Sequence, residues 1–172
     1  MKKFVLIPFL LFIISCSTQS VSIDYDRTQD FSQIRDFKIE WTDNTVRELN
    51  VNRIQNAIQN ELAQKSMVLN ENSDNVLSIN ANEFTSQSQN SNIGVGVGSG
   101  GRSFGTSIGM NIPITSEKLN QVYLVSLYNT AGQLVWQGKM SIQMPEDSSG
   151  LTIETNIKKG VQKLFKNYPP KK

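Results

Sequence analysis

The stretch VYLVSLYNTAGQLVWQGKMSIQM, residues 122–144, decides the fold. Its first part is apolar at odd and even positions alike, which is typical of a central strand or one covered on both sides. The segment NTAGQ then predicts a tight turn with Gly132 at a positive φ. Over residues 134–144 apolar and polar side chains alternate, so Leu134 and Trp136 are expected to face the core. Together these residues predict two adjacent antiparallel strands.

The same alternation recurs along the chain. It predicts further strands over residues 21–25, 37–41, 76–83 and 106–114. Trp41 lies on the apolar side of its strand, so it is expected in the core rather than on a ligand platform. Pro113 has no N–H to donate, which places the strand over 106–114 at a sheet edge.

Apolar residues at three- and four-residue steps predict two amphipathic helices, over residues 49–65 and 151–166. Asn50 is a candidate cap for the first helix, and Asp30 for a helical turn over 31–34. Strands, helix, strands and helix in this order predict an α+β fold. We expect a mainly antiparallel sheet with two helices packed on one face.

The N-terminus has the pattern of an exported protein. Lys2 and Lys3 precede a short apolar run, which is typical of a secretory signal peptide over residues 1–15. The run ends in Ile13-Ile14-Ser15-Cys16, which resembles the lipobox of bacterial lipoproteins. The resemblance implies cleavage between Ser15 and Cys16 and acylation of Cys16. We therefore expect a lipidated cysteine and tether over 16–22 and one domain over 23–172.

Charge and cysteine content narrow the function classes. The chain has 17 basic and 15 acidic residues, and loss of Lys2 and Lys3 leaves 15 of each. A neutral mature chain has no cationic field to hold nucleic acid, so none is expected as a partner. Cys16 is the single cysteine, so no disulfide framework is available. Residue 17 is Ser rather than Asp, which among lipoproteins favours the outer membrane; we expect the domain to face the periplasm.

A glycine-rich segment contains Gly96-x-Gly98-x-x-Gly101, the spelling of a dinucleotide-binding turn. That motif requires a strand before it and a helix after it, whereas polar residues precede it here and a strand pattern follows. We interpret residues 86–103 as a long Gly/Ser-rich loop joining two strands. As an alternative, Ile93, Val95 and Val97 form the apolar face of a ribbon that touches membrane or a partner.

No catalytic, cofactor-binding or metal-binding residue is predicted. The chain has no histidine, which removes imidazole bases and histidine metal ligands. Asp24, Asp26, Thr28 and Asp30 are spaced like the start of a calcium loop. The Gly and Glu that such a loop requires later are replaced by Gln29 and Arg35. We therefore interpret the acidic residues as a strand end and a cap.

The mature chain resembles DUF4136, a family of bacterial envelope lipoproteins. The resemblance rests on residues 25–41, 52–67, 74–79, 128–140 and 157–170. Ser66 and Tyr168 depart from the Gly and Phe that the family often has there. The resemblance implies an envelope address and a fold, and it carries over no catalytic residue. The expected function is partner binding or envelope assembly; the alternatives are a hydrolase using carboxylates and a carrier of a small apolar ligand.

Overall fold

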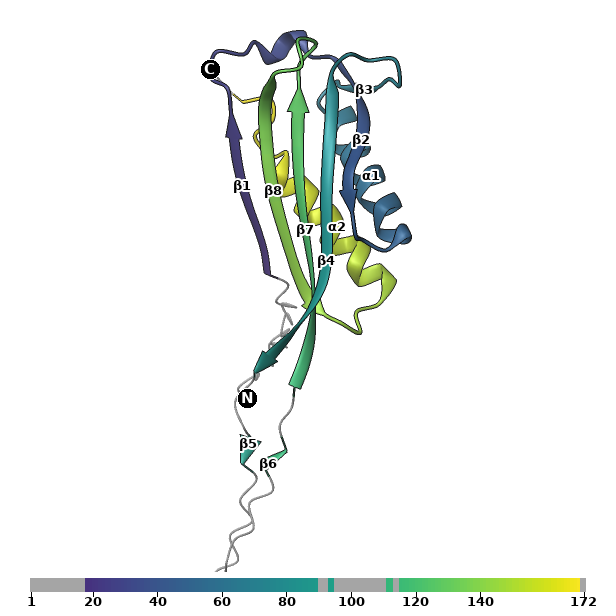
Figure 1. Ribbon diagram of the computed structural model, residues 1–172, viewed down its shortest axis with the longest axis vertical. Helices are drawn as coiled ribbons and strands as arrows, with labels where there is room; N and C mark the ends of the chain where they lie inside the picture. The colour runs from purple at the N-terminus through teal and green to yellow at the C-terminus, as the bar shows by residue number, and fades with distance from the viewer. Residues whose placement is uncertain (1–17, 90–92, 95–110, 113–114, 171–172) are drawn as a thin grey trace, which may run out of the picture.

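The computed structural model describes residues 18–89, 93–94, 111–112 and 115–170 (Figure 1). In chain order its elements are β1 (Thr18–Tyr25), the 3-10 turn η1 (Phe31–Gln33), β2 (Asp36–Asn44), α1 (Glu48–Ala63), β3 (Val68–Leu69), β4 (Val76–Gln89), β5 (Ile93–Gly94), β6 (Asn111–Ile112), β7 (Thr115–Tyr128), β8 (Leu134–Pro145) and α2 (Gly150–Leu164).

Six strands form one sheet in the order β1-β8-β7-β4-β2-β3, and β5 pairs with β6 separately. The pairs β1–β8, β8–β7 and β7–β4 are antiparallel, whereas β2 runs parallel to β4 and β3. The parallel neighbours need a crossover connection, which α1 provides. Both helices cover the same face of the sheet (Figure 1). The predicted α+β fold, mainly antiparallel with two helices on one face, is confirmed.

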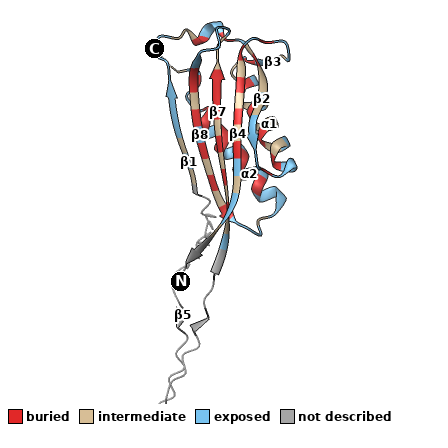
Figure 2. Ribbon diagram, viewed as in Figure 1, coloured by how far each residue is buried: buried red, intermediate tan, exposed pale blue. Residues whose placement is uncertain are grey.

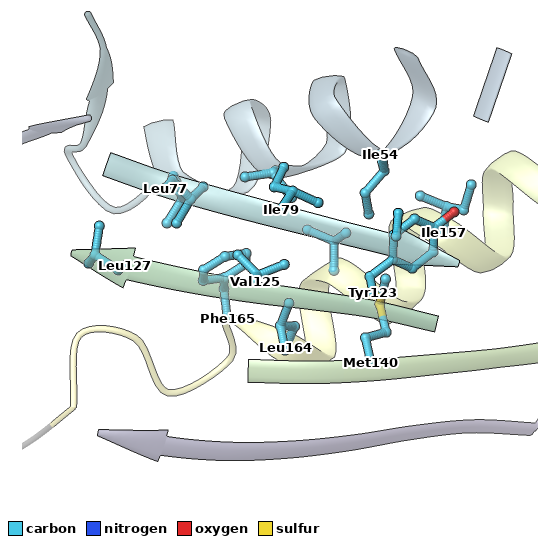
Figure 3. Close-up of a cluster of buried hydrophobic side chains, with 14 of the residues drawn as sticks. Ile54, Leu77, Ile79, Tyr123, Val125, Leu127, Met140, Ile157, Leu164 and Phe165 are labelled. Atoms are coloured by element: carbon cyan, nitrogen blue, oxygen red, sulfur yellow. The ribbon is translucent and has the colours of Figure 1, made fainter. Parts of the chain in front are cut away.

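The core lies between this face and the helices, and buried residues concentrate on β4, β7 and β8 (Figure 2). Trp136 is buried as predicted, whereas Trp41 is half-buried and packs against the core from its edge. Figure 3 shows strand and helix side chains meeting in this layer. The labelled residues, all buried, are Ile54, Leu77, Ile79, Tyr123, Val125, Leu127, Met140, Ile157, Leu164 and Phe165.

Gly138 lets α2 lie directly on β8. A Cβ at this position would lie 2.5 Å from Leu164 Cδ1 and 2.7 Å from Trp136 Cη2. Both of those side chains are buried, so neither can move aside at low cost. The absence of a side chain on β8 therefore fixes how close the end of α2 comes to the sheet.

Two local predictions are wrong. Asn50 does not cap α1, because the helix already begins at Glu48 and Asn50 is buried inside its first turns. The Asn44 side chain instead accepts from Val46 N (2.9 Å) just before the helix. Leu134 does not face the core: a register shift at the start of β8 puts Val135 in a buried position and leaves Leu134 46% exposed.

Several boundaries also differ. β4 and β7 extend to Gln89 and Thr115, so strand pairing takes up the start of the loop expected over 86–103. Residues 18–22, expected as tether, belong to β1 because they pair with β8. The strand expected over 106–114 lies largely outside the described residues. The Asp30 cap and the positive φ of Gly132 (72°) are confirmed.

Candidate functional site

A surface groove lies between the second half of β1 and the chain that follows α2. We call it the β1 groove; its volume is about 840 Å³. Its lining is largely apolar and aromatic, with one cation at the rim. The lining residues are Ile23, Tyr25, Trp136, Lys166, Asn167, Tyr168, Pro169 and Pro170.

The groove exists because α2 covers only the first half of β1. There, Gln19 Nε2 donates to the carbonyl and side-chain oxygens of Asn156 (3.3 Å each), and Lys163 Nζ donates to Gln19 O (3.0 Å). α2 ends at Leu164, before it reaches the second half of the strand. Ile23 and Tyr25 point to the same side of the sheet as the core but remain 40% and 37% exposed.

Aromatic rings form the floor of the groove. Trp136 and Phe165 are stacked, with ring centroids 5.1 Å apart and planes at 16°. Tyr168 meets Trp136 edge-on at 5.7 Å, and Phe31 meets Tyr168 edge-on at 5.9 Å. Burial raises the pKa of Tyr168, so its hydroxyl stays neutral. The floor is therefore apolar, uncharged and held in place by packing.

The backbone of β1 adds a second feature to the groove. β1 is an edge strand with β8 as its strand partner. The carbonyl of Gln19 accepts from Lys163 and the N–H of Tyr25 donates to Asp24 Oδ1 (2.9 Å), so neither group is used toward β8. Alternate residues of an antiparallel strand point their backbone groups the same way, so those of Val21 and Ile23 also face the open side. Within the part of the chain that the structure describes, an apolar groove thus lies beside a strand edge that no further strand pairs with.

A separate polar cluster lies at the other end of the helix layer, centred on Glu83. Its carboxylate accepts from Arg47 Nε, from Asn50 Nδ2 (2.9 Å) and from Gln121 Nε2 (2.7 Å). Burial acts to raise the pKa of Glu83, but the three donors lower it below its usual value. The side chain is 8% exposed. A carboxylate held ionised by three donors ties α1 to β4 and β7; it is a poor candidate for a proton donor.

The sequence-predicted positions fall in two groups. Ser15, Cys16, the glycines 96, 98 and 101, and Val95 and Val97 lie outside the described residues. Asp26 and Asp30 are described and act locally, as expected: Asp26 Oδ1 accepts from Thr28 N (2.7 Å) and Asp30 Oδ1 from Ser32 N (3.1 Å). In the described part of the chain no group of three acidic or sulfur side chains could hold a metal ion. No described helix has the length and apolarity to cross a membrane.

Sequence reasoning missed the β1 groove. In the sequence, Ile23 and Tyr25 indicate an ordinary amphipathic strand. Pro169 and Pro170 indicate only that the last helix ends before them. Nothing in the pattern links two segments about 140 residues apart. The one available signal is weak: a strand with apolar alternation near a terminus, without the lysine or proline that usually protects an edge.

Comparison with known proteins supports this fold. A PDZ domain protein from Parabacteroides distasonis superposes with a TM-score of 0.51 at 17% identity, over 91% of this chain and 37% of that one. This chain thus spans little more than a third of that protein's length. The PelC dodecamer from Paraburkholderia phytofirmans gives 0.51 at 11% identity, over 86% and 95%. A minor lipoprotein from Acinetobacter baumannii gives 0.45 at 8%, over 78% and 91%.

The first two of these likenesses show a shared fold; at these identities they carry no information on activity. No curated protein sequence matches the chain. The profile of the DUF4136 family, a domain of unknown function, matches residues 21–170. Because this match spans nearly the whole domain, the chain belongs to the DUF4136 family.

Proposed function

We propose that this protein is a lipid-anchored envelope protein that binds an extended segment of a partner polypeptide in the β1 groove. Acylated Cys16 would hold it on the outer membrane, with the domain in the periplasm; the lipobox-like sequence supports this anchor. The observation that carries the binding role is the coincidence of an unpaired strand edge with an apolar, aromatic groove beside it.

The partner would bind by strand addition. Its backbone would pair with the open N–H and C=O groups of Val21 and Ile23, which gives affinity without regard to sequence. Its alternate side chains would enter the groove against Tyr25 and the aromatic floor, which selects apolar or aromatic residues. Lys166, exposed at the rim, offers a cation to an acidic group or chain end. A second copy of this chain is one candidate source of such a strand.

The two alternatives fit the described residues less well. A hydrolase using carboxylates needs an acid and a base converging in a pocket, whereas Glu83 is fully engaged by its three donors. A carrier of a small apolar ligand needs an enclosed cavity, whereas Ile23 and Tyr25 keep the β1 groove open to solvent.

Site-specific crosslinking in intact cells tests the proposal. A photo-crosslinking residue replaces Tyr25 in the groove or, as a control, Val68, which is 63% exposed at the far edge of the sheet. We expect a reproducible crosslinked partner from position 25 and none from position 68. Failure of position 25 to capture any protein in repeated experiments would contradict partner binding at this site.

A matched pair of variants tests strand addition itself. Val21→Pro removes an N–H from the open edge while leaving the β8 pairing intact, and Val21→Ala keeps that N–H. We expect the crosslink at position 25 to fall at least several-fold in Val21→Pro and to persist in Val21→Ala. Equal crosslinking in both variants would mean that the partner does not pair with β1.

A further inference from the structure

The start of β1 fixes how near the domain lies to its expected anchor. Thr18, the first residue of the strand, follows Cys16 by two residues. Two residues of fully extended chain span at most about 7 Å. If Cys16 is acylated, as the proposed function holds, the end of the domain that carries Thr18 lies at the lipid surface.

The register of the sheet shows which other residues lie at the same end of the domain as Thr18. Thr18 pairs with Gln143, Gln143 with Asn120, and Asn120 with Phe84, so these four residues form one row across the sheet. β4 and β7 continue past the row to Gln89 and Thr115 (Figure 1). β8 follows them as far as Pro145, opposite Lys118, and beyond that point the two strands form a two-stranded extension. We call residues 84–89 and 115–120 the arm. Five residues beyond Phe84 add roughly 17 Å, more than the anchor's reach.

The stretch between the two strands of the arm is almost uncharged, although the arm itself carries Glu117 and Lys118. Residues 84–116 contain one charged residue, Arg102, whereas 19% of the whole chain is charged. Phe84 opens this stretch and is 49% exposed on the face of the sheet away from the helices. A segment with few charges costs less to place at the headgroup–acyl boundary, where a charged group loses part of its hydration.

Two leucines at the same end are exposed without a partner in the described structure. Leu49 and Leu151 are 67% and 75% exposed, more than any other large apolar side chain described. They lie in the first turns of α1 and α2, which both begin at the arm end (Figure 1). The two helix starts are neighbours, since a Cβ on Gly150 would lie 3.0 Å from the Arg53 guanidinium.

The charges at this end argue against attraction to anionic lipid as the cause. Glu146 and Asp147 are exposed in the turn between β8 and α2, where Glu146 N donates to the carbonyl of the exposed Glu117 (3.1 Å). Of the basic residues at this end, Arg47 pairs with Glu83, and Lys118 Nζ donates to Gln143 Oε1 (3.4 Å). Contact would therefore depend on apolar side chains rather than on a basic patch.

From these observations we infer that the arm end is the membrane-facing end of the domain, with Phe84, Leu49 and Leu151 touching lipid and the arm entering the headgroup layer. The inference rests on the proposed acylation of Cys16. It also places the β1 groove: seven residues of strand separate Thr18 from Tyr25, which holds the groove roughly 23 Å away from the lipid surface. A partner strand in the periplasm could then reach it.

Depth-sensitive quenching in vesicles tests the orientation. Because acylation consumes Cys16, a cysteine introduced elsewhere is the single free thiol of the mature chain. Full-length acylated Phe84→Cys, Leu151→Cys and, as a control at the other end, Val68→Cys would each carry an environment-sensitive fluorophore. The vesicles would contain phosphatidylethanolamine, phosphatidylglycerol and lipids with a quencher near the headgroup.

We expect quenching at positions 84 and 151 to exceed that at position 68 at least threefold, with little change on raising the phosphatidylglycerol content. Equal quenching at all three positions, in protein that floats with the vesicles, would overturn the orientation and leave the anchor standing. Protein that fails to float with the vesicles would overturn the anchor and, with it, the orientation.

Discussion

The two ends of the helix layer close the same fold by different means. At the groove end, Trp136, Phe165 and Tyr168 pack as rings around the end of α2. At the arm end, Glu83 ties α1 to the sheet through hydrogen bonds from Arg47 and other polar groups. The first end depends on apolar burial, which is insensitive to pH; the second depends on an ionised carboxylate. The ends should therefore respond differently to substitution and to acid.

The largest effect is expected at the groove end. Phe165→Ala removes a ring that is 1% exposed and stacked on Trp136, and it leaves a cavity under the groove. We expect the free energy of unfolding to fall by about 3–5 kcal/mol, the same at pH 7 and pH 4.5. Urea denaturation measures it. Lys166→Ala, at the exposed next residue, should change stability by less than about 0.5 kcal/mol.

At the arm end, Glu83→Gln keeps the shape of the side chain but removes its charge. We expect a loss of about 1–3 kcal/mol at pH 7, because hydrogen bonds to a charged acceptor are replaced by weaker ones. The pKa of Glu83 is lowered in the folded state, so its stabilisation is complete above its ordinary pKa, about 4.5, and is lost as the pH falls further.

Urea denaturation of wild type and Glu83→Gln from pH 7 to pH 3 measures this linkage. The difference between the two proteins should shrink below pH 4.5 as the wild-type carboxylate is protonated. Glu40→Gln is the matched control, since Glu40 is exposed and pairs with Lys38 at the surface (3.0 Å). Its effect should stay below about 1 kcal/mol. A difference that stays constant with pH would show that Glu83 contributes by shape alone.

Two buried tyrosines sharpen the comparison. Tyr168 at the groove end and Tyr123 near the Glu83 cluster both bury a hydroxyl that has no partner among the described residues. Tyr168→Phe should raise the free energy of unfolding by about 1 kcal/mol, because it removes an unpaired polar atom from apolar surroundings. Tyr123→Phe should raise the free energy of unfolding by less, because the charges of Glu83 and Arg53 interact electrostatically with the Tyr123 hydroxyl. Thermal unfolding of both variants decides the order; a loss at Tyr168 would mean that its hydroxyl is paired in solution.

How much of the structure the sequence could predict depends on how far apart along the chain the interacting residues lie. The strand over 134–144 and the helix over 151–166 have apolar residues at short, regular spacings. The α+β fold can therefore be predicted from local patterns. The prediction that Leu134 faces the core was wrong, because the register shift at this residue is set by pairing with β7 and not by the alternation within β8 itself. The prediction that Asn50 caps α1 was wrong for a related reason. The Asn50 side-chain amide donates to the carboxylate of Glu83, which lies 33 residues away along the chain.

The same distinction between local and distant residues applies to the candidate site. The anchor motif at Cys16 is four adjacent residues, so it can be read directly, although it stays a prediction. The β1 groove joins Tyr25 to Pro169 and Pro170, and its opening depends on where α2 ends relative to β1. No local period encodes that relation; it appears once the sheet order is known.

The smallest effect concerns backbone conformation rather than side-chain packing. After α1, Ser66 has a φ of 62°, and Met67 N donates to Leu62 O (3.0 Å) in the closing turn. Glycine enters this conformation without strain but costs more entropy on folding, so Ser66→Gly should stabilise by about 0.5 kcal/mol. Gln64→Gly, two residues earlier at a helical φ of −64°, should destabilise by about 0.5–1 kcal/mol. Urea denaturation of the pair tests the sign: a loss in both variants would mean that the left-handed turn is not kept in solution.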